Sequence, residues 1–202
     1  MHLTRTPPSA ITPSKLPIPT DVVPSRVRLT RTAYYMLFDA GLIGEKCELI
    51  DGEIVEKMPQ GAAHTQAVRR AERLMRRLFG EEYVYSQTPL VLNEYDEPEP
   101  DIFVTTLPET AFTQQQPNAG ESRLAVEVSV STLDYDKGKK ASRYALAGVV
   151  DYWVLDVTNR KLLVYRNPQN GAYPAPQELT ETDTVSPLAL PTATIAVKDL
   201  LP

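Results

Sequence analysis

The order of short apolar segments along the chain most constrains how it can fold. A helical segment lies between the third and the fourth of them. Their spacing predicts strands over residues 83–92, 101–105, 123–130, 151–156 and 161–166. Residues 135–147 predict a helix that ends at Gly148, and Pro89 limits the first strand to an edge or a bend. Strands that alternate with helices favour an α/β fold, here a mixed sheet with helices covering its faces.

Three further elements are expected before these strands. Thr30 can cap a helix over residues 32–40 that Gly41 ends. Asp51-Gly52 lies between two short alternating segments and is the strongest hairpin signal in the sequence. A second helix follows, and one of its faces is apolar, formed by Ala63, Ala67, Ala71, Leu74 and Leu78.

Composition limits the class of protein. Residues 1–27 contain six prolines and predict an extended, flexible arm, which leaves residues 28–202 as one domain. Cys47 is the only cysteine, which excludes an intrachain disulfide and a thiolate zinc cluster. No apolar run reaches the roughly 18 residues of a membrane span, and no secretory signal is visible, so a cytoplasmic location without membrane contact is expected.

Two carboxylates are placed where a metal ion could bind. Asp101 begins one apolar strand, and Glu127 lies between two valines in another. Asp101 could equally be a strand-edge carboxylate after a turn proline. Glu127 would be buried in a central strand, which is costly unless the carboxylate is paired or binds a cation. Two carboxylates at neighbouring strand ends suit Mg²⁺, a cation that prefers oxygen ligands.

Lys140 is the lysine that should reach these acids. It belongs to a basic stretch whose ordinary interpretation is a solvated helix start. Helical spacing places Lys140, Tyr144 and Ala147 on one face, which we expect to point toward the sheet, whereas Lys139 points elsewhere. A cation at this place could stabilise the charge that develops on a phosphate or activate a water molecule.

Two other side chains remain open at this stage. Glu48, in the first hairpin strand, is either a third carboxylate of the site or an exposed strand residue. His64 lies on the apolar side of the second helix, where a lone histidine is more often a hydrogen-bonded core residue than a ligand.

The other side of the second helix is rich in arginine. Such a surface is usually a solvated face, but on a chain of net charge −5 it is also the best candidate for contacts with phosphate. The residues are Arg69, Arg70, Arg73, Arg76 and Arg77. The acidic balance itself argues against broad, charge-driven binding of nucleic acid.

The ordered set of motifs resembles the Uma-two family of restriction endonucleases, a branch of the PD-(D/E)xK nuclease superfamily. The resemblance covers roughly residues 30–200 and is carried by Glu48-Leu49-Ile50-Asp51-Gly52-Glu53-Ile54, His64, Pro98-Glu99-Pro100-Asp101-Ile102, Val126-Glu127-Val128-Ser129, Asp136-Lys137-Gly138-Lys139-Lys140, Tyr144-Ala145-Leu146-Ala147-Gly148-Val149 and Asp151-Tyr152-Trp153. No P-loop, dinucleotide fingerprint, zincin motif or nucleophile elbow competes with it.

The resemblance implies a restriction-endonuclease-like core with an added N-terminal helix and β-hairpin. It implies that Mg²⁺, or Mn²⁺ in its place, is held by Asp101, Glu127 and the backbone carbonyl of Val128. It also implies that Lys140 is catalytic together with Asp101, Glu127 and the accessory acid Glu48. The accessory candidates are Glu48, His64 and Tyr144.

Ser129 departs from the superfamily pattern, because it stands where the catalytic lysine usually does, two residues after the glutamate. This departure is expected if the lysine has moved to the following helix, as in many relatives.

Our hypothesis is therefore a Mg²⁺-dependent endonuclease that hydrolyses DNA phosphodiester bonds, with DNA as partner and a homodimer as the expected assembly. Two alternatives stay open. One is a non-catalytic module of the same fold that binds nucleic acid or protein, and the other is an assembly protein that dimerises through its hairpins or sheet edge.

Overall fold

A computed structural model describes residues 26–202 of the chain. The arm predicted for residues 1–27 lies outside the described residues except for its last two positions. Within residues 26–202, no helix has the length and apolar character needed to cross a membrane.

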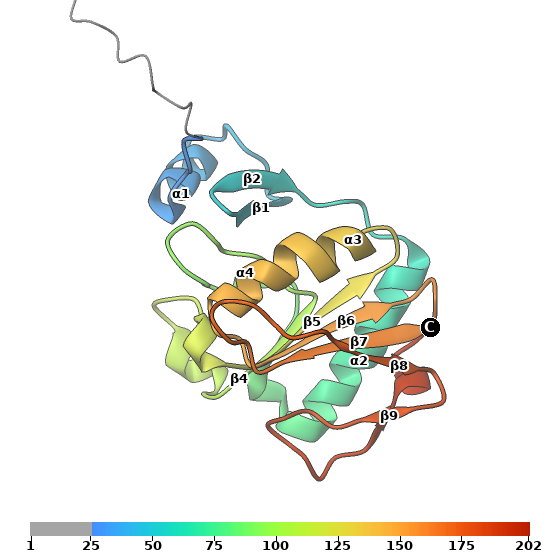
Figure 1. Cartoon of the computed structure of the whole chain (residues 1–202). Helices are drawn as coiled ribbons and strands as arrows, with labels where there is room; N and C mark the ends of the chain where they lie inside the picture. Colours follow the sequence, from blue (N-terminus) through green and yellow to red (C-terminus); the bar gives the residue numbers. More distant parts are fainter. Residues whose placement is uncertain (1–25) are drawn as a thin grey trace, which may run out of the picture.

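A six-stranded mixed sheet forms the centre of the structure (Figure 1). Its strands lie in the order β3-β4-β5-β6-β7-β8, in which β5 and β6 are parallel and all other neighbours are antiparallel. The bounds are β3 (Val84–Tyr85), β4 (Ile102–Thr105), β5 (Ser122–Ser129), β6 (Asp151–Asp156), β7 (Lys161–Arg166) and β8 (Gln177–Thr180). The α/β fold with a mixed sheet that the sequence predicts is confirmed.

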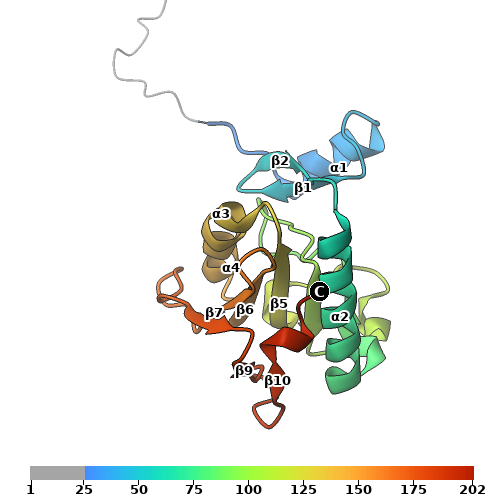
Figure 2. The same ribbon diagram turned by 90° about the vertical axis from the view of Figure 1, so that its right-hand side faces the viewer.

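Helices cover both faces of this sheet, and Figure 2 shows α2 on one side with α3 and α4 on the other. α2 (Ala62–Phe79) packs against β3, β4 and β5. The parallel pair β5 and β6 requires a crossover connection, which consists of α3 (Leu133–Tyr135), the π-helical turn η4 (Asp136–Lys140) and α4 (Ala141–Leu146). The predicted helix over residues 135–147 is thus present, with a π-helical turn that the sequence did not indicate.

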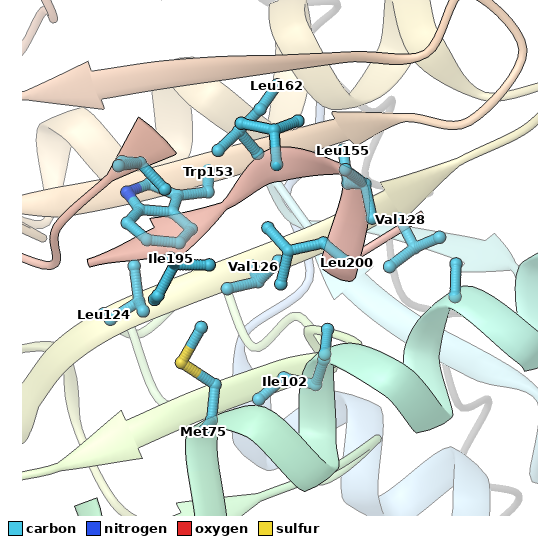
Figure 3. Close-up of a cluster of buried hydrophobic side chains, with 14 of the residues drawn as sticks. Met75, Ile102, Leu124, Val126, Val128, Trp153, Leu155, Leu162, Ile195 and Leu200 are labelled. Atoms are coloured by element: carbon cyan, nitrogen blue, oxygen red, sulfur yellow. The ribbon is translucent and has the colours of Figure 1, made fainter. Parts of the chain in front are cut away.

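Alternation along the strands divides the core into two layers, because successive side chains point to opposite faces. Ile102, Val126 and Trp153 face α2 and pack with Met75 in the larger cluster, drawn in Figure 3. Phe103, Ala125 and Tyr152 face the crossover and pack with Tyr144. The C-terminal residues Ile195, Val197, Leu200 and Leu201 join the larger cluster.

An N-terminal unit lies over one end of the sheet (Figures 1 and 2). It contains α1 (Arg31–Asp39) and the hairpin of β1 (Cys47–Ile50) and β2 (Glu53–Glu56). The Thr30 hydroxyl accepts a hydrogen bond of 3.2 Å from the Ala33 amide and so caps α1, as expected. Asp51 and Gly52 both have positive φ and form the predicted hairpin turn.

Two segments differ from the prediction. The strand expected over residues 83–92 is ordered as β3 for only two residues, because Gln87 adopts φ +49° and Pro89 has no amide to donate. No strand is predicted after residue 166, but the chain there forms β8 and the small pair β9 (Thr184–Val185) and β10 (Ile195–Ala196). Leu179 is the only buried residue of β8, so this strand has no apolar alternation that would predict it from sequence.

The hairpin turn offers a test of this packing. A Cβ atom at Gly52 would lie 2.9 Å from the Cα and 2.5 Å from the Cβ of Arg28, whereas a Cβ at Gly41 would meet nothing within 4 Å. Both glycines have positive φ, so alanine costs about 1 kcal/mol at either site from conformation alone. We expect Gly52→Ala to lower the free energy of unfolding, measured by urea titration, clearly more than Gly41→Ala. Equal losses would show that Arg28 does not pack against the turn.

Candidate active site

Lys140 lies at the centre of a buried ionic cluster. Its Nζ is 3.1 Å from Oε1 of Glu127 on β5 and 3.1 Å from Oε1 of Glu48 on β1, and the residue is 7% exposed. Burial alone would lower the pKa of Lys140, but the charges of these carboxylates raise it well above its ordinary value. The ammonium group is therefore a fixed positive charge shared by three elements of the fold.

Glu127 is held from the helix side. Its Oε1 accepts hydrogen bonds from Lys140 and, at 2.9 Å, from the Tyr144 hydroxyl one helical turn further on. Burial raises the pKa of Glu127, against the opposing effect of the Lys140 charge.

Asp101 lies beside Glu127 because of the strand register. Ile102 pairs with Val126 in the antiparallel ladder of β4 and β5, and one further step places Asp101 opposite Glu127. Oδ2 of Asp101 accepts a 2.8 Å hydrogen bond from the Val128 amide and lies 3.2 Å from Nε2 of His64. The two strand-end acids predicted from sequence are therefore neighbours in space.

The two residues that the sequence left open both lie in this cluster. Glu48 is 4% exposed, and its Oε2 accepts a 3.1 Å hydrogen bond from the amide of Glu99. His64 is held by Asp101, while its Nδ1 is buried without a hydrogen bond to any described residue. Burial lowers the pKa of His64, but the hydrogen bond and the charge of Asp101 outweigh this effect and raise it.

These side chains line a cavity of about 550 Å³ between the hairpin, the start of α2 and the crossover helix. Oδ1 of Asp101 and Oε2 of Glu127 accept no hydrogen bond from another described residue. Neither atom is completely buried. Each acid thus retains an oxygen that can bind a further group at this cavity.

Comparison with known proteins assigns the chain to a family. The model of the Uma2 family, described as "Putative restriction endonuclease", matches residues 42–198, which is more than half of the chain. The chain belongs to the Uma2 family. The curated proteins include no match to it.

A solved structure shares the fold of this Uma2 protein. It is described as a putative nuclease belonging to DUF820, from Anabaena variabilis ATCC 29413. The match covers 81% of this chain and 96% of that one, with a TM-score of 0.61 and 17% sequence identity. At this identity the likeness shows a common fold.

Asp136 is a site residue that the sequence reasoning missed. It is 4% exposed in η4, lines the same cavity, and accepts 2.6 Å hydrogen bonds from the hydroxyls of Ser129 and Thr132. Burial raises its pKa. Its position four residues before Lys140 was the available signal, because that spacing places both on one helical face. Ser129, two residues after Glu127, thus holds the Asp136 carboxylate in place.

The donor set fits a hard divalent cation. Among residues 26–202, no three His, Cys, Asp or Glu side chains are grouped as a complete metal site. The two carboxylates with free oxygens and the nearby main chain of Val128 nevertheless supply only oxygen ligands, which Mg²⁺ and Mn²⁺ prefer. Water molecules complete the coordination of Mg²⁺ in many proteins, so a small number of protein ligands is ordinary for this ion.

Removal of the buried cation should destabilise the fold. In Lys140→Met the acids Glu48 and Glu127 lose their shared counter-ion. We expect the free energy of unfolding to fall by about 3–5 kcal/mol at neutral pH. The pKa of Glu127 lies above its ordinary 4.5 even with lysine present and should rise further in the variant. A carboxyl group whose pKa is raised in the folded state stabilises the fold at low pH, and this stabilisation is lost as the pH rises through the raised pKa. The difference in unfolding free energy between Lys140→Met and the unmodified protein should therefore be smaller at acidic pH.

The matched control is Lys139→Met, whose lysine pairs with the half-buried Glu53 near the surface. Urea unfolding of both variants across the acidic and neutral range measures the effect. If Lys140→Met were no less stable than Lys139→Met, the cluster would not support the fold.

Proposed function

We propose that this Uma2 protein is a Mg²⁺-dependent endonuclease that hydrolyses DNA phosphodiester bonds. The observation that carries the proposal is the meeting of Asp101, Glu127 and Lys140 at one cavity, two acids and a cation drawn from β4, β5 and the crossover helix. Membership of a family described as restriction endonucleases supports the same reaction class.

In this proposal Asp101, Glu127 and the carbonyl of Val128 hold Mg²⁺, and Mn²⁺ can take its place. When bound, such an ion polarises phosphoryl oxygens and lowers the pKa of water. Hydrolysis joins a water oxygen to phosphorus and breaks one P–O ester bond, while the attacking water loses a proton and the leaving oxygen gains one.

The remaining residues act through charge and position. Lys140, paired with two carboxylates, is a cation that can stabilise the negative charge on the phosphate in the transition state. Glu48 is a positioning residue that holds Lys140 from the hairpin side, and Tyr144 orients Glu127. His64 positions Asp101. A homodimer would let two such sites reach both strands of a duplex.

The first test is cleavage of plasmid DNA. Asp101→Asn and Glu127→Gln keep the shape of each side chain but remove its charge, so each should reduce Mg²⁺-dependent cleavage by about 100-fold or more. Asp134→Asn is the control, because Asp134 lines the same cavity but is exposed and pairs with Lys137. Undiminished cleavage by Asp101→Asn, with the fold intact by circular dichroism, would refute the assigned roles.

Calorimetry separates this proposal from a non-catalytic module of the same fold. The absence of lysine at position 129 motivates that alternative. We expect Mn²⁺ to bind the unmodified chain and to lose its affinity by at least about tenfold in Glu127→Gln. A protein that binds DNA but shows no heat of Mn²⁺ binding would be the binding module instead.

A further inference from the structure

The outward face of α2 carries a row of arginines. The opposite face of the helix is buried in the core through Ala67, Ala71 and Met75. Arg69, Arg73 and Arg77 follow one another at four-residue spacing and are exposed, with Arg70 beside them. We call these four residues the arginine strip. They line a groove of about 1040 Å³.

The strip differs from the other arginines in its lack of acidic partners. Arg123 lies over the ring of Tyr83 and donates to a carbonyl oxygen. All remaining arginines of residues 26–202 outside the strip form ion pairs with Asp or Glu: Arg26, Arg28, Arg31, Arg76, Arg143, Arg160 and Arg166. No described carboxylate forms an ion pair with a member of the strip.

The helix dipole does not explain this arrangement. It favours cations only in the last turn of a helix, where Arg76 and Arg77 lie. Arg69, Arg70 and Arg73 are in the middle of α2. Arg76, in contrast, is held between Glu72 and Glu81, so the same helix carries both a neutralised arginine and four that are not. Net charge remains −5, which makes this concentration of positive charge a local property.

The groove lies next to the cavity of the candidate active site. Gln60 lines both the groove and the cavity that holds Asp101 and Glu127. α2 begins at that cavity, where His64 contacts Asp101, and Figure 2 shows the helix running from the hairpin end of the molecule along the side of the sheet. A long polyanion could therefore occupy the cavity and the groove together.

The lining favours contact with phosphates over contact with bases. Thr65 and Gln66 add hydrogen-bonding side chains next to the arginines, a set typical of phosphate contacts. No aromatic side chain lines the groove, so stacking of unpaired bases is not favoured. The two acids of the lining are Asp199 and Glu72, and Glu72 is already neutralised by Arg76.

We propose that the arginine strip is a docking surface for the sugar–phosphate backbone of duplex DNA, which it holds to one side of the scissile bond. This inference rests on the proposed nuclease function and adds how the substrate is held. At 1.5 Å per residue, α2 extends about 20 Å from His64 to Arg77. This length corresponds to about six base pairs of duplex. Because the contacts are to phosphates, the strip contributes affinity without sequence preference.

The test is binding of a fluorescently labelled duplex in EDTA, measured by anisotropy across a range of salt. The strip variant combines Arg69→Gln, Arg73→Gln and Arg77→Gln. We expect its affinity to fall about tenfold or more. The slope of log affinity against log salt should become shallower by about 3, because each phosphate that the protein neutralises adds about 0.9 to its magnitude.

The control removes the same charge from outside the groove, by Lys46→Gln, Arg160→Gln and Lys161→Gln, and should retain both affinity and slope. Unchanged binding by the strip variant, or a wild-type protein that binds no duplex, would overturn the inference. Binding of anionic phospholipid vesicles in place of the duplex would overturn it as well.

The measurement is independent of catalysis, because EDTA prevents metal-dependent cleavage. A strip variant that loses binding while the wild type never cleaves DNA would support the strip and reject the nuclease. A wild type that cleaves with Mg²⁺ while the strip variant binds normally would reject the strip and leave the nuclease standing.

Discussion

The pairing of one buried ammonium group with two buried acids is the interaction on which the rest of the site depends. Lys140 contacts Glu127 on the central strand β5 and Glu48 on the N-terminal hairpin, so a single charge joins the crossover helix, the sheet and the hairpin. Neither acid could be buried cheaply without it. A second clamp of the same kind acts nearby, where the fully buried Asp96 accepts hydrogen bonds from the Asp51 amide and from Arg143 on α4. These charged groups, together with main-chain hydrogen bonds to residues 94–97, attach the N-terminal unit to the rest of the domain, and the hairpin forms one wall of the cavity.

The two faces of the sheet have separate roles. The crossover side carries the ionic cluster, in which the π-helical turn brings Asp136 and Lys140 inward together, and the Tyr152 hydroxyl supports the turn by donating to the Asp136 carbonyl. π-helical turns of this kind are frequent at functional sites. The other side carries α2, whose inner face completes the core and whose outer face concentrates positive charge. An acidic protein can therefore present a cationic groove directly beside an acidic cavity, an arrangement that suits a metal ion in one and a polyanion in the other.

Much of the candidate site follows from local pattern. The place of Glu127 between two valines of an apolar strand indicated that it would be buried. Helical spacing selected Lys140 over Lys139, whose side chain pairs with the half-buried Glu53 instead. Asp136 was not predicted as a site residue. Its carboxylate is held by the hydroxyls of Ser129 and Thr132, and the periodicity of its own helix does not indicate these partners. The strand expected over residues 83–92 is present only as β3, because Leu90 and Leu92 are buried outside any named strand.

The sequence by itself determined the elements whose causes are short in range. The Thr30 cap, the Asp51-Gly52 turn, the apolar stripe of α2 and the burial of the central strands each depend on residues a few positions apart. Only the tertiary structure decided which elements meet. From sequence, Glu48 could equally face solvent, and its burial depends on the packing of the hairpin against the crossover helix. The four arginines of the strip could likewise be paired with acids, but within residues 26–202 no carboxylate forms an ion pair with them. The energy of a buried charge depends on the groups that surround it in space, and those groups come from segments far apart in the chain.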